Sequence, residues 1–374
     1  MKKIFYLSIV ALVALALPSC NKSIRSVETP GEVVNTATGN VTVTLNTLEN
    51  PSTKALSSNA AESKINAVHV FIFDKTTGKR ETDRFEQVTG TVNGSYTMTL
   101  TSLTGLKEVW AVVNAPRIVN VENVTALKQK VSDLGENSIT NLLMTGYNAN
   151  VDIQETNANI TSQASVVTNA DINVSRLGAR ISLNNVTVDF TNTDLEGATF
   201  AVTGLYLKNV VGSICMDGTS SGINLTWYNM SNQSNVLAAP AAIQALTKDM
   251  PISLACNSAG TQTALGYSWY VYPNATTAGQ DSNAEGVAAP RRTRLVIKAH
   301  LSGTSVGGAL DEDTYYVFSI PEIRRNYAYN INTLKITMRG KPNDDSDEPT
   351  NSGAVSATIT VQGWESEQTL EYNL

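Results

Sequence analysis

The chain has 374 residues, of which 42% are hydrophobic and only 16% are charged, and its formal net charge is −6. This length allows two domains. An acidic balance without a basic patch gives no basis for nucleic-acid binding. Thr, Asn, Ser, Val and Ala dominate, which favours strands and turns and suits an exported all-β protein.

The first twenty residues have the pattern of an export signal. Lys2 and Lys3 precede an apolar run at residues 4–17, which is too short to span a membrane as a helix. The sequence Leu17-Pro18-Ser19-Cys20 resembles the lipobox of bacterial lipoproteins, which implies that Cys20 becomes the lipidated first residue. The alternative is an ordinary cleaved signal, residues 1–19, followed by an incidental cysteine.

A strand is predicted at residues 40–48, after a polar tether at 20–39. Val41, Val43 and Leu45 share one face of this strand, and threonine and asparagine share the other. A polar loop follows at once, with Pro51 and the basic Lys54, and loops of this kind are where proteases cut.

The next segments predict further strands and one helix. The pair Asn93-Gly94 indicates a hairpin between strands at 85–89 and 95–100. Apolar residues from Val121 to Leu134 recur every three or four positions, which predicts a helix capped by Asn120. Further strands are expected at 65–74, 107–114, 151–153 and 164–167.

The second half of the chain, from residue 171, also reads as strands. A long strand at 172–190 is expected to break around 176–180, and Pro240 suits a helix start within 235–250. The remaining strands are expected at 200–211, 266–272, 294–301, 314–320 and 327–338.

The last segment combines an acidic linker at residues 341–353 with an alternating tail at 354–374. The tail changes phase at Gly363, which indicates a bulge or a bend between two strand segments. Such a tail either pairs with its own sheet or serves another chain. Its apolar residues are Val355, Ile359, Val361, Trp364, Leu370, Tyr372 and Leu374.

We therefore predict an all-β fold with one or two short helices, arranged as two transthyretin-like, Greek-key β-sandwich domains in tandem. The N-terminal domain is expected at residues 40–170 and the C-terminal domain at 171–340. Regular turn signals between the strands and the length of the chain support this division.

No catalytic, cofactor or metal site is expected. The only histidines, His69 and His300, have no partner at the spacing of zinc ligands, and His69 reads as a satisfied or exposed strand histidine. No phosphate loop or nucleophile elbow is present. Cys215 and Cys256 are interpreted as small buried residues, although an exported protein could pair them.

Taken in order, these segments resemble the fimbrillin family, the major subunits of the type V pili of Bacteroidia. The resemblance spans nearly the whole chain, from the lipobox at Cys20 through VTVTLNTL, INAVHVFIFD, LKEVWAVVNAP, VSRLGARISLNNVTV and IRRNYAYNINTLKI to ATITVQGWE. It implies a non-enzymatic subunit of a surface fimbria, exported as an outer-membrane lipoprotein precursor. Its implied partners are further copies of itself and the anchor and tip subunits.

The resemblance also implies how such subunits assemble. A trypsin-like protease cuts behind the first strand, the strand leaves, and the C-terminal strand of another subunit fills the groove. The matching cut lies between Lys54 and Ala55, where the family usually has an arginine. Arg25 precedes the strand, and a cut after Arg80 or Arg84 would destroy a core strand. Lysine at Ile359 or Val361 is expected to block assembly and leave the precursor folded.

Two other interpretations remain at this point. The chain could be a glycan-binding surface lipoprotein that uses Trp227, Tyr228, Trp269 and Tyr270, although core packing is the simpler role for the last two. It could also be the tip or anchor subunit of the same pilus. A cuttable loop together with a donor-like tail favours the stalk or the tip.

Overall fold

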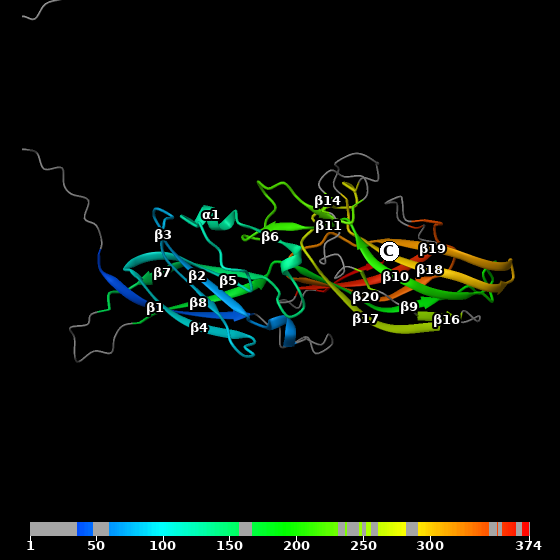
Figure 1. The fold of residues 1–374 in the computed structure, drawn as a ribbon, viewed down its shortest axis with the longest axis horizontal. Coiled ribbons are helices and arrows are strands. Elements are labelled where there is room, and N and C mark those ends of the chain that lie inside the picture. The colour runs from blue at the N-terminus through cyan, green and yellow to red at the C-terminus, as the bar shows by residue number, and fades with distance from the viewer. Residues whose placement is uncertain are drawn as a thin grey trace, which may run out of the picture. The chain divides into compact units, whose positions relative to one another are not determined.

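The computed structural model describes residues 36–47, 60–156, 167–230, 236–237, 247–248, 252–255, 261–281, 291–343, 350, 354–363 and 369–373 (Figure 1). All of them belong to one compact unit, Thr36–Leu374. Within these ranges the regular secondary structure consists almost entirely of strands, which confirms the predicted all-β fold. None of the helices in these ranges is long and apolar enough to cross a membrane.

The first sheet has seven strands in the order β3-β2-β5-β7-β8-β1-β4. Its strands are β1 (Thr38–Thr47), β2 (Ala67–Asp74), β3 (Arg80–Gln87), β4 (Ser95–Leu103), β5 (Gly105–Val113), β7 (Met144–Ile153) and β8 (Thr168–Arg176). The two end strands, β3 and β4, meet through side chains: Arg84 donates to the Thr99 carbonyl at 2.7 Å, and Ser102 donates to Glu81 at 2.9 Å. The sheet therefore folds over on itself and encloses one apolar core.

Two five-stranded sheets build the second half of the chain. One has the order β17-β9-β20-β21-β22, and the other has the order β15-β10-β18-β19 with β16 also paired to β10. Their strands are β9 (Ala179–Val188), β10 (Thr199–Lys208), β15 (Thr247–Lys248), β16 (Ile252–Ala255), β17 (Thr261–Val271), β18 (Arg294–Ser305), β19 (Gly308–Ser319), β20 (Tyr327–Ile336), β21 (Val355–Gly363) and β22 (Thr369–Asn373). Side chains of both sheets share a second core that includes Phe200, Tyr316 and Ile331. This packing confirms the predicted β-sandwich architecture.

Short elements connect these sheets. They are η1 (Ala60–Ser63), α1 (Val124–Lys128), β6 (Val131–Asp133), η2 (Leu134–Glu136), β11 (Val210–Val211), β12 (Ser213–Cys215), β13 (Trp227–Tyr228) and β14 (Val236–Leu237). β6 pairs with β12, and β11, β13 and β14 form a small sheet.

The predicted helix over residues 121–134 is much shorter in the structure, because the chain turns into β6 after α1. Its cap is Asn123, whose side chain accepts a hydrogen bond from the Ala126 amide at 2.9 Å, and not Asn120. The helical spacing nevertheless marked the buried residues Val121, Leu127 and Leu134, although Val131, on the same predicted face, is 50% exposed. The second predicted helix, at Pro240, lies outside the described residues.

The predicted hairpin around Asn93-Gly94 is wrong. β3 pairs with β2, and β4 pairs with β1, so the two strands do not form a ladder with each other. Gly94 does make a turn, with φ of 81°, and its carbonyl accepts the amide of Thr47 at 2.7 Å. The turn signal was therefore correct, and the partner of each strand was decided by packing across the whole sheet.

The strand expected at 172–190 breaks where it was predicted to break. β8 ends at Arg176 and β9 starts at Ala179, and the chain changes sheet between them. The expected division after residue 170 falls inside β8, which pairs with β1 over residues 168–174 and with β7 at Ser175 and Arg176. Residues 171–176 therefore belong to the first sheet.

Candidate functional site

β1 lies between two other strands and is not an edge of its sheet (Figure 1). It runs parallel to β8 and antiparallel to β4, so that Val43 lies opposite Ala170 on one side and Met98 on the other. Hydrogen bonding on both sides requires an uninterrupted run of extended residues, and the alternating valine and threonine of β1 supply it.

The two faces of β1 have different surroundings. Val41, Val43 and Leu45 are fully buried in the first core, as the alternation predicts. On the other face Thr42 meets Thr99, with 3.2 Å between their hydroxyl oxygens, and Thr44 accepts from Thr97 at 3.4 Å. One face of β1 therefore covers the first core, and its other face forms a row of threonine pairs with β4.

Gly39 stands at the start of this buried face, and the sequence reasoning did not single it out. A Cβ atom at this position would overlap the backbone carbonyl oxygen of Gln154 and lie 2.8 Å from Cγ2 of Ile153. No side chain fits there, because a backbone oxygen cannot rotate away. The signal in the sequence was a glycine two residues before the first buried valine.

Residues 48–59 connect the C-terminal end of β1 to the rest of the chain. They lie outside the described part and contain Lys54 and Ala55. The chain is described again from η1, which leads into β2. A cut anywhere in this segment would leave β1 attached to the fold behind it by non-covalent contacts alone.

The residues just after this segment are held firmly. Oε1 of Glu62 lies 2.7 Å from Nη1 of Arg180 on β9 and accepts the hydroxyl of Tyr270 on β17 at 2.7 Å. The carbonyl of Glu62 also accepts the guanidinium of Arg176 at 3.1 Å. Burial together with the neighbouring Glu62 carboxylate raises the pKa of Tyr270 well above its ordinary value. Nothing in the sequence marks these partners, because they are more than a hundred residues apart.

The tail lies within the sheet of its own chain. β21 is hydrogen-bonded to β20 on one side and to β22 on the other. Val355, Ile359 and Val361 are buried in the second core. Leu370 and Tyr372 lie on β22, opposite Val361 and Ile359 in the ladder, whereas Trp364 lies outside the described residues. The change of phase at Gly363 corresponds to the end of β21.

One expectation about this tail is wrong. Ile359 is fully buried and Val361 is 4% exposed. Lysine at either position would place a charge in the core of the precursor itself, so these variants would not leave the precursor folded. The reason is that β21 is a core strand of its own chain.

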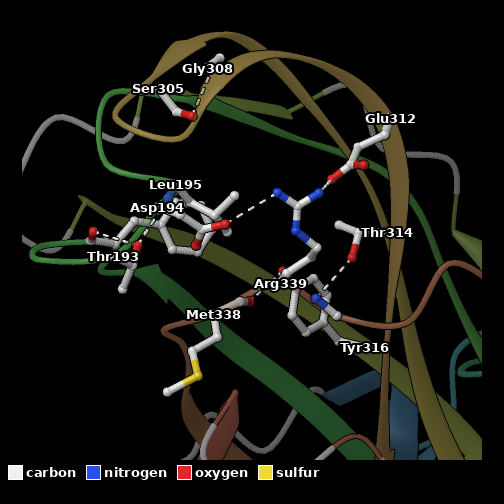
Figure 2. A network of polar contacts seen from close by, with 12 residues as sticks. Thr193, Asp194, Leu195, Ser305, Gly308, Glu312, Thr314, Tyr316, Met338 and Arg339 are labelled. Carbon is white, nitrogen blue, oxygen red and sulfur yellow. Dashed lines mark hydrogen bonds and ion pairs between the residues drawn. The ribbon is translucent and has the colours of Figure 1, made fainter.

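The chain is bound to β19 both before and after residues 344–349 of the linker. Figure 2 shows Arg339 between Glu312 and Asp194, which it contacts through ion pairs. Beyond Arg339, Gly340 donates its amide to Thr314 at 2.9 Å. After residues 344–349, which are not described, Thr350 bonds with Val317 through its amide and its hydroxyl, both at 2.8 Å.

His69 is a buried strand residue whose ring nitrogens are both hydrogen-bonded. His69 is 1% exposed, and its Nε2 lies 3.0 Å from Asp83 while its Nδ1 accepts the amide of Ile118 at 3.3 Å. Burial lowers the pKa of His69, although Asp83 acts in the opposite sense. Over the described ranges, no three His, Cys, Asp or Glu side chains gather as metal ligands would.

The aromatic residues considered for glycan binding do not form an open platform. Tyr228 and Trp269 are 1% exposed, and Trp227 is partly buried. The hydroxyl of Tyr270 donates a hydrogen bond to the carboxylate of Glu62. Cys215 is a buried free thiol, in keeping with its predicted role, and Cys256 lies outside the described residues.

No protein-family model matches the sequence, and no curated protein matches it either. Among solved structures, a fimbrilin of Porphyromonas gingivalis has a TM-score of 0.58 at 17% identity, covering 87% of this chain and 98% of its own. A candidate cell adhesion protein of Bacteroides eggerthii has a TM-score of 0.59 at 19% identity, covering 88% and 98%. Another, from Parabacteroides distasonis, has a TM-score of 0.58 at 17% identity over 88% and 98%.

These likenesses establish the fold of the chain. It is the all-β fold shared by a fimbrilin and by candidate adhesion proteins of related bacteria. None of the three proteins is described as an enzyme.

Proposed function

We propose that this chain is the stalk subunit of a cell-surface fimbria that supports adhesion. It is exported as an outer-membrane lipoprotein anchored through Cys20. A trypsin-like protease cuts between Lys54 and Ala55, β1 leaves, and the tail of another copy takes its place. Its partners are therefore further copies of itself and the anchor and tip subunits of the same fimbria.

The observation that carries this proposal is the position of β1. Loss of β1 would open a groove with unpaired amides and carbonyls on both β4 and β8 and with an apolar floor. A strand of alternating apolar residues fits such a groove, since backbone bonds supply affinity and alternate side chains supply specificity. A tail that joins one copy to the next head to tail gives an open filament.

The flanks of β1 support the same proposal. The only covalent connection behind it runs through residues 48–59, where Lys54 lies, and the chain is held again by Glu62 directly afterwards. A cut in this segment would therefore leave β1 held by non-covalent contacts alone, so that it can be displaced without loosening β2. The fold shared with a fimbrilin agrees with a role as fimbrial subunit.

The test is controlled proteolysis of the purified precursor. Limited trypsin treatment should give a new N-terminus at Ala55 and then filaments, visible by electron microscopy and as a ladder on a gel of unboiled sample. The variant Lys54→Gln should stay uncut at this position and monomeric. A precursor cut after Lys54 that loses residues 1–54 and remains monomeric would overturn the proposal.

A further inference from the structure

The groove that β1 occupies accepts only a glycine at the position of Gly39. The place of Gly39 has no room for a side chain, because a Cβ there would overlap the carbonyl oxygen of Gln154. That oxygen belongs to the backbone directly after β7, so it cannot move without disturbing the sheet. Any strand that fills the whole groove must therefore present glycine at this position.

The buried face of β1 continues from Gly39 at every second residue. The sequence of the tail contains a similar arrangement, a glycine followed at every second position by branched or small residues, which are apolar except for Thr47 in β1. The β1 positions are Gly39, Val41, Val43, Leu45 and Thr47, and those of the tail are Gly353, Val355, Ala357, Ile359 and Val361. Residues 353–361 thus match residues 39–47 at the glycine and at the three apolar positions that follow it, whereas Val361 falls at the place of Thr47. Gly353 itself lies outside the described residues.

We infer that residues 353–361 of a second copy replace β1 in the same direction, with Gly353 in the place of Gly39. This inference rests on the proposed function and names the donor segment, its direction and its register. The donor runs parallel to β8 and antiparallel to β4, as β1 does. Ile359 takes the place of Leu45, an exchange that conserves volume.

The opposite direction also offers a glycine, because Gly363 would then occupy the place of Gly39. In that direction Ala357 would replace Leu45 and leave a cavity three carbons large, and Ile359 would overfill the place of Val43. In the same direction as β1, the one underfilled position is that of Val43, where Ala357 lacks two carbons. Cavities and overpacking both destabilise a core, so the direction of β1 is favoured.

The donor segment keeps its own burial when it moves. In the precursor, Val355, Ala357, Ile359 and Val361 are at most 7% exposed. β21 is paired on both sides there, with β20 and with β22, as it would be between β4 and β8. The move opens an edge on β20 of the donor, which explains why the tail stays in its own sheet until an empty groove is available.

Disulfide crosslinking tests the register. Thr358 takes the place of Thr44, whose hydroxyl lies 3.4 Å from that of Thr97. Precursor carrying Thr97→Cys is mixed with precursor carrying Thr358→Cys, and the mixture is cut and oxidised. Disulfide-linked pairs should appear in the filament. Thr44→Cys with Thr97→Cys in one uncut precursor is the positive control for geometry, and each single variant alone controls for the native thiols.

A second pair of crosslinks tests the direction. Thr42 faces Thr99 at 3.2 Å, and its place is taken by Ser356 in the proposed direction and by Thr360 in the opposite one. Thr99→Cys should therefore crosslink with Ser356→Cys. A crosslink with Thr360→Cys instead would overturn the direction.

The two glycines give an independent readout. Gly353→Val should abolish filaments from a cut precursor, whereas Gly363→Val should leave them, provided that circular dichroism shows both precursors folded. Filaments that form without the crosslink between positions 97 and 358 would overturn this inference and leave the proposed function standing. A cut precursor that forms no filaments at all would instead overturn the proposed function.

Discussion

Glu62 and Arg180 form a buried ion pair, with 2.7 Å between Oε1 and Nη1, although 118 positions separate them in the sequence. Glu62 belongs to η1, just before β2 of the first sheet, and Arg180 belongs to β9 of the second half. The pair therefore ties the start of β2 to the second half of the molecule, directly behind the proposed cutting position.

The variant Glu62→Ala should add a second position at which trypsin cuts the precursor. It leaves the Arg180 guanidinium buried without this carboxylate, and the loss of one partner of a buried pair costs about 3–5 kcal/mol. Once η1 is loosened, we expect trypsin to cut after Lys64 as well as after Lys54. Protein sequencing should then find Ile65 at the new N-terminus, whereas the native chain gives Ala55.

The matched control for this variant is Glu122→Ala, because Glu122 is exposed. It should change the free energy of unfolding by no more than about 0.5 kcal/mol and leave the cutting pattern unchanged. If Glu62→Ala gave the native N-terminus and native stability, the anchoring role of Glu62 would be wrong.

The variant Leu45→Ala should weaken the packing of β1 against the first core and so lower the unfolding free energy of the precursor. Leu45 is fully buried, and removal of its side chain leaves a cavity that costs about 2–5 kcal/mol in the unfolding free energy of the precursor. Thr44→Ala, on the other face of the strand, should cost less than about 1 kcal/mol. Urea unfolding followed by circular dichroism measures both. Equal effects of the two variants would contradict the described burial of β1.

The variant Gly39→Ala should destabilise the precursor, because the added Cβ meets the Gln154 carbonyl and forces β1 and the end of β7 apart. We expect a loss of roughly 1–3 kcal/mol, as for other overpacked sites. Gly279→Ala is the control, since nothing lies within 4 Å of a Cβ built there. A Gly39→Ala precursor as stable as the native one would show that the groove has room at this position.

His69 should make the stability of the precursor depend on pH. Burial lowers its pKa from the ordinary 6.5, so the unfolded chain binds a proton more readily than the folded one. Its contribution is therefore fully present above pH 6.5 and is lost as the pH falls toward the folded value. Asp83, Arg80 and Arg117 are the charged groups that act on it.

We expect the melting temperature of the native precursor to fall more between pH 7 and pH 5 than that of His69→Gln. Comparison of the two proteins by scanning calorimetry removes the effect of the other titrating groups. Equal slopes would mean that His69 titrates alike in the folded and unfolded states.

Local patterns predicted much of the secondary structure. The alternation at Val41, Val43 and Leu45 predicted both the strand and its buried face, since successive side chains of a strand point to opposite sides. The break between Arg176 and Ala179 and the two segments of the tail were also predicted from local sequence. These features depend on neighbouring residues alone, so the sequence by itself was enough to determine them.

Only the tertiary structure decided which strands are neighbours. Nothing near Asn93-Gly94 shows that β3 pairs with β2 and β4 with β1, because strand partners are chosen by burial across the whole sheet. The same holds for the Glu62–Arg180 pair and for the crowding at Gly39, each of which depends on residues distant in sequence. The sequence determined which segments extend and which of their faces are apolar; long-range packing determined that β1 is a central strand whose loss would open a groove.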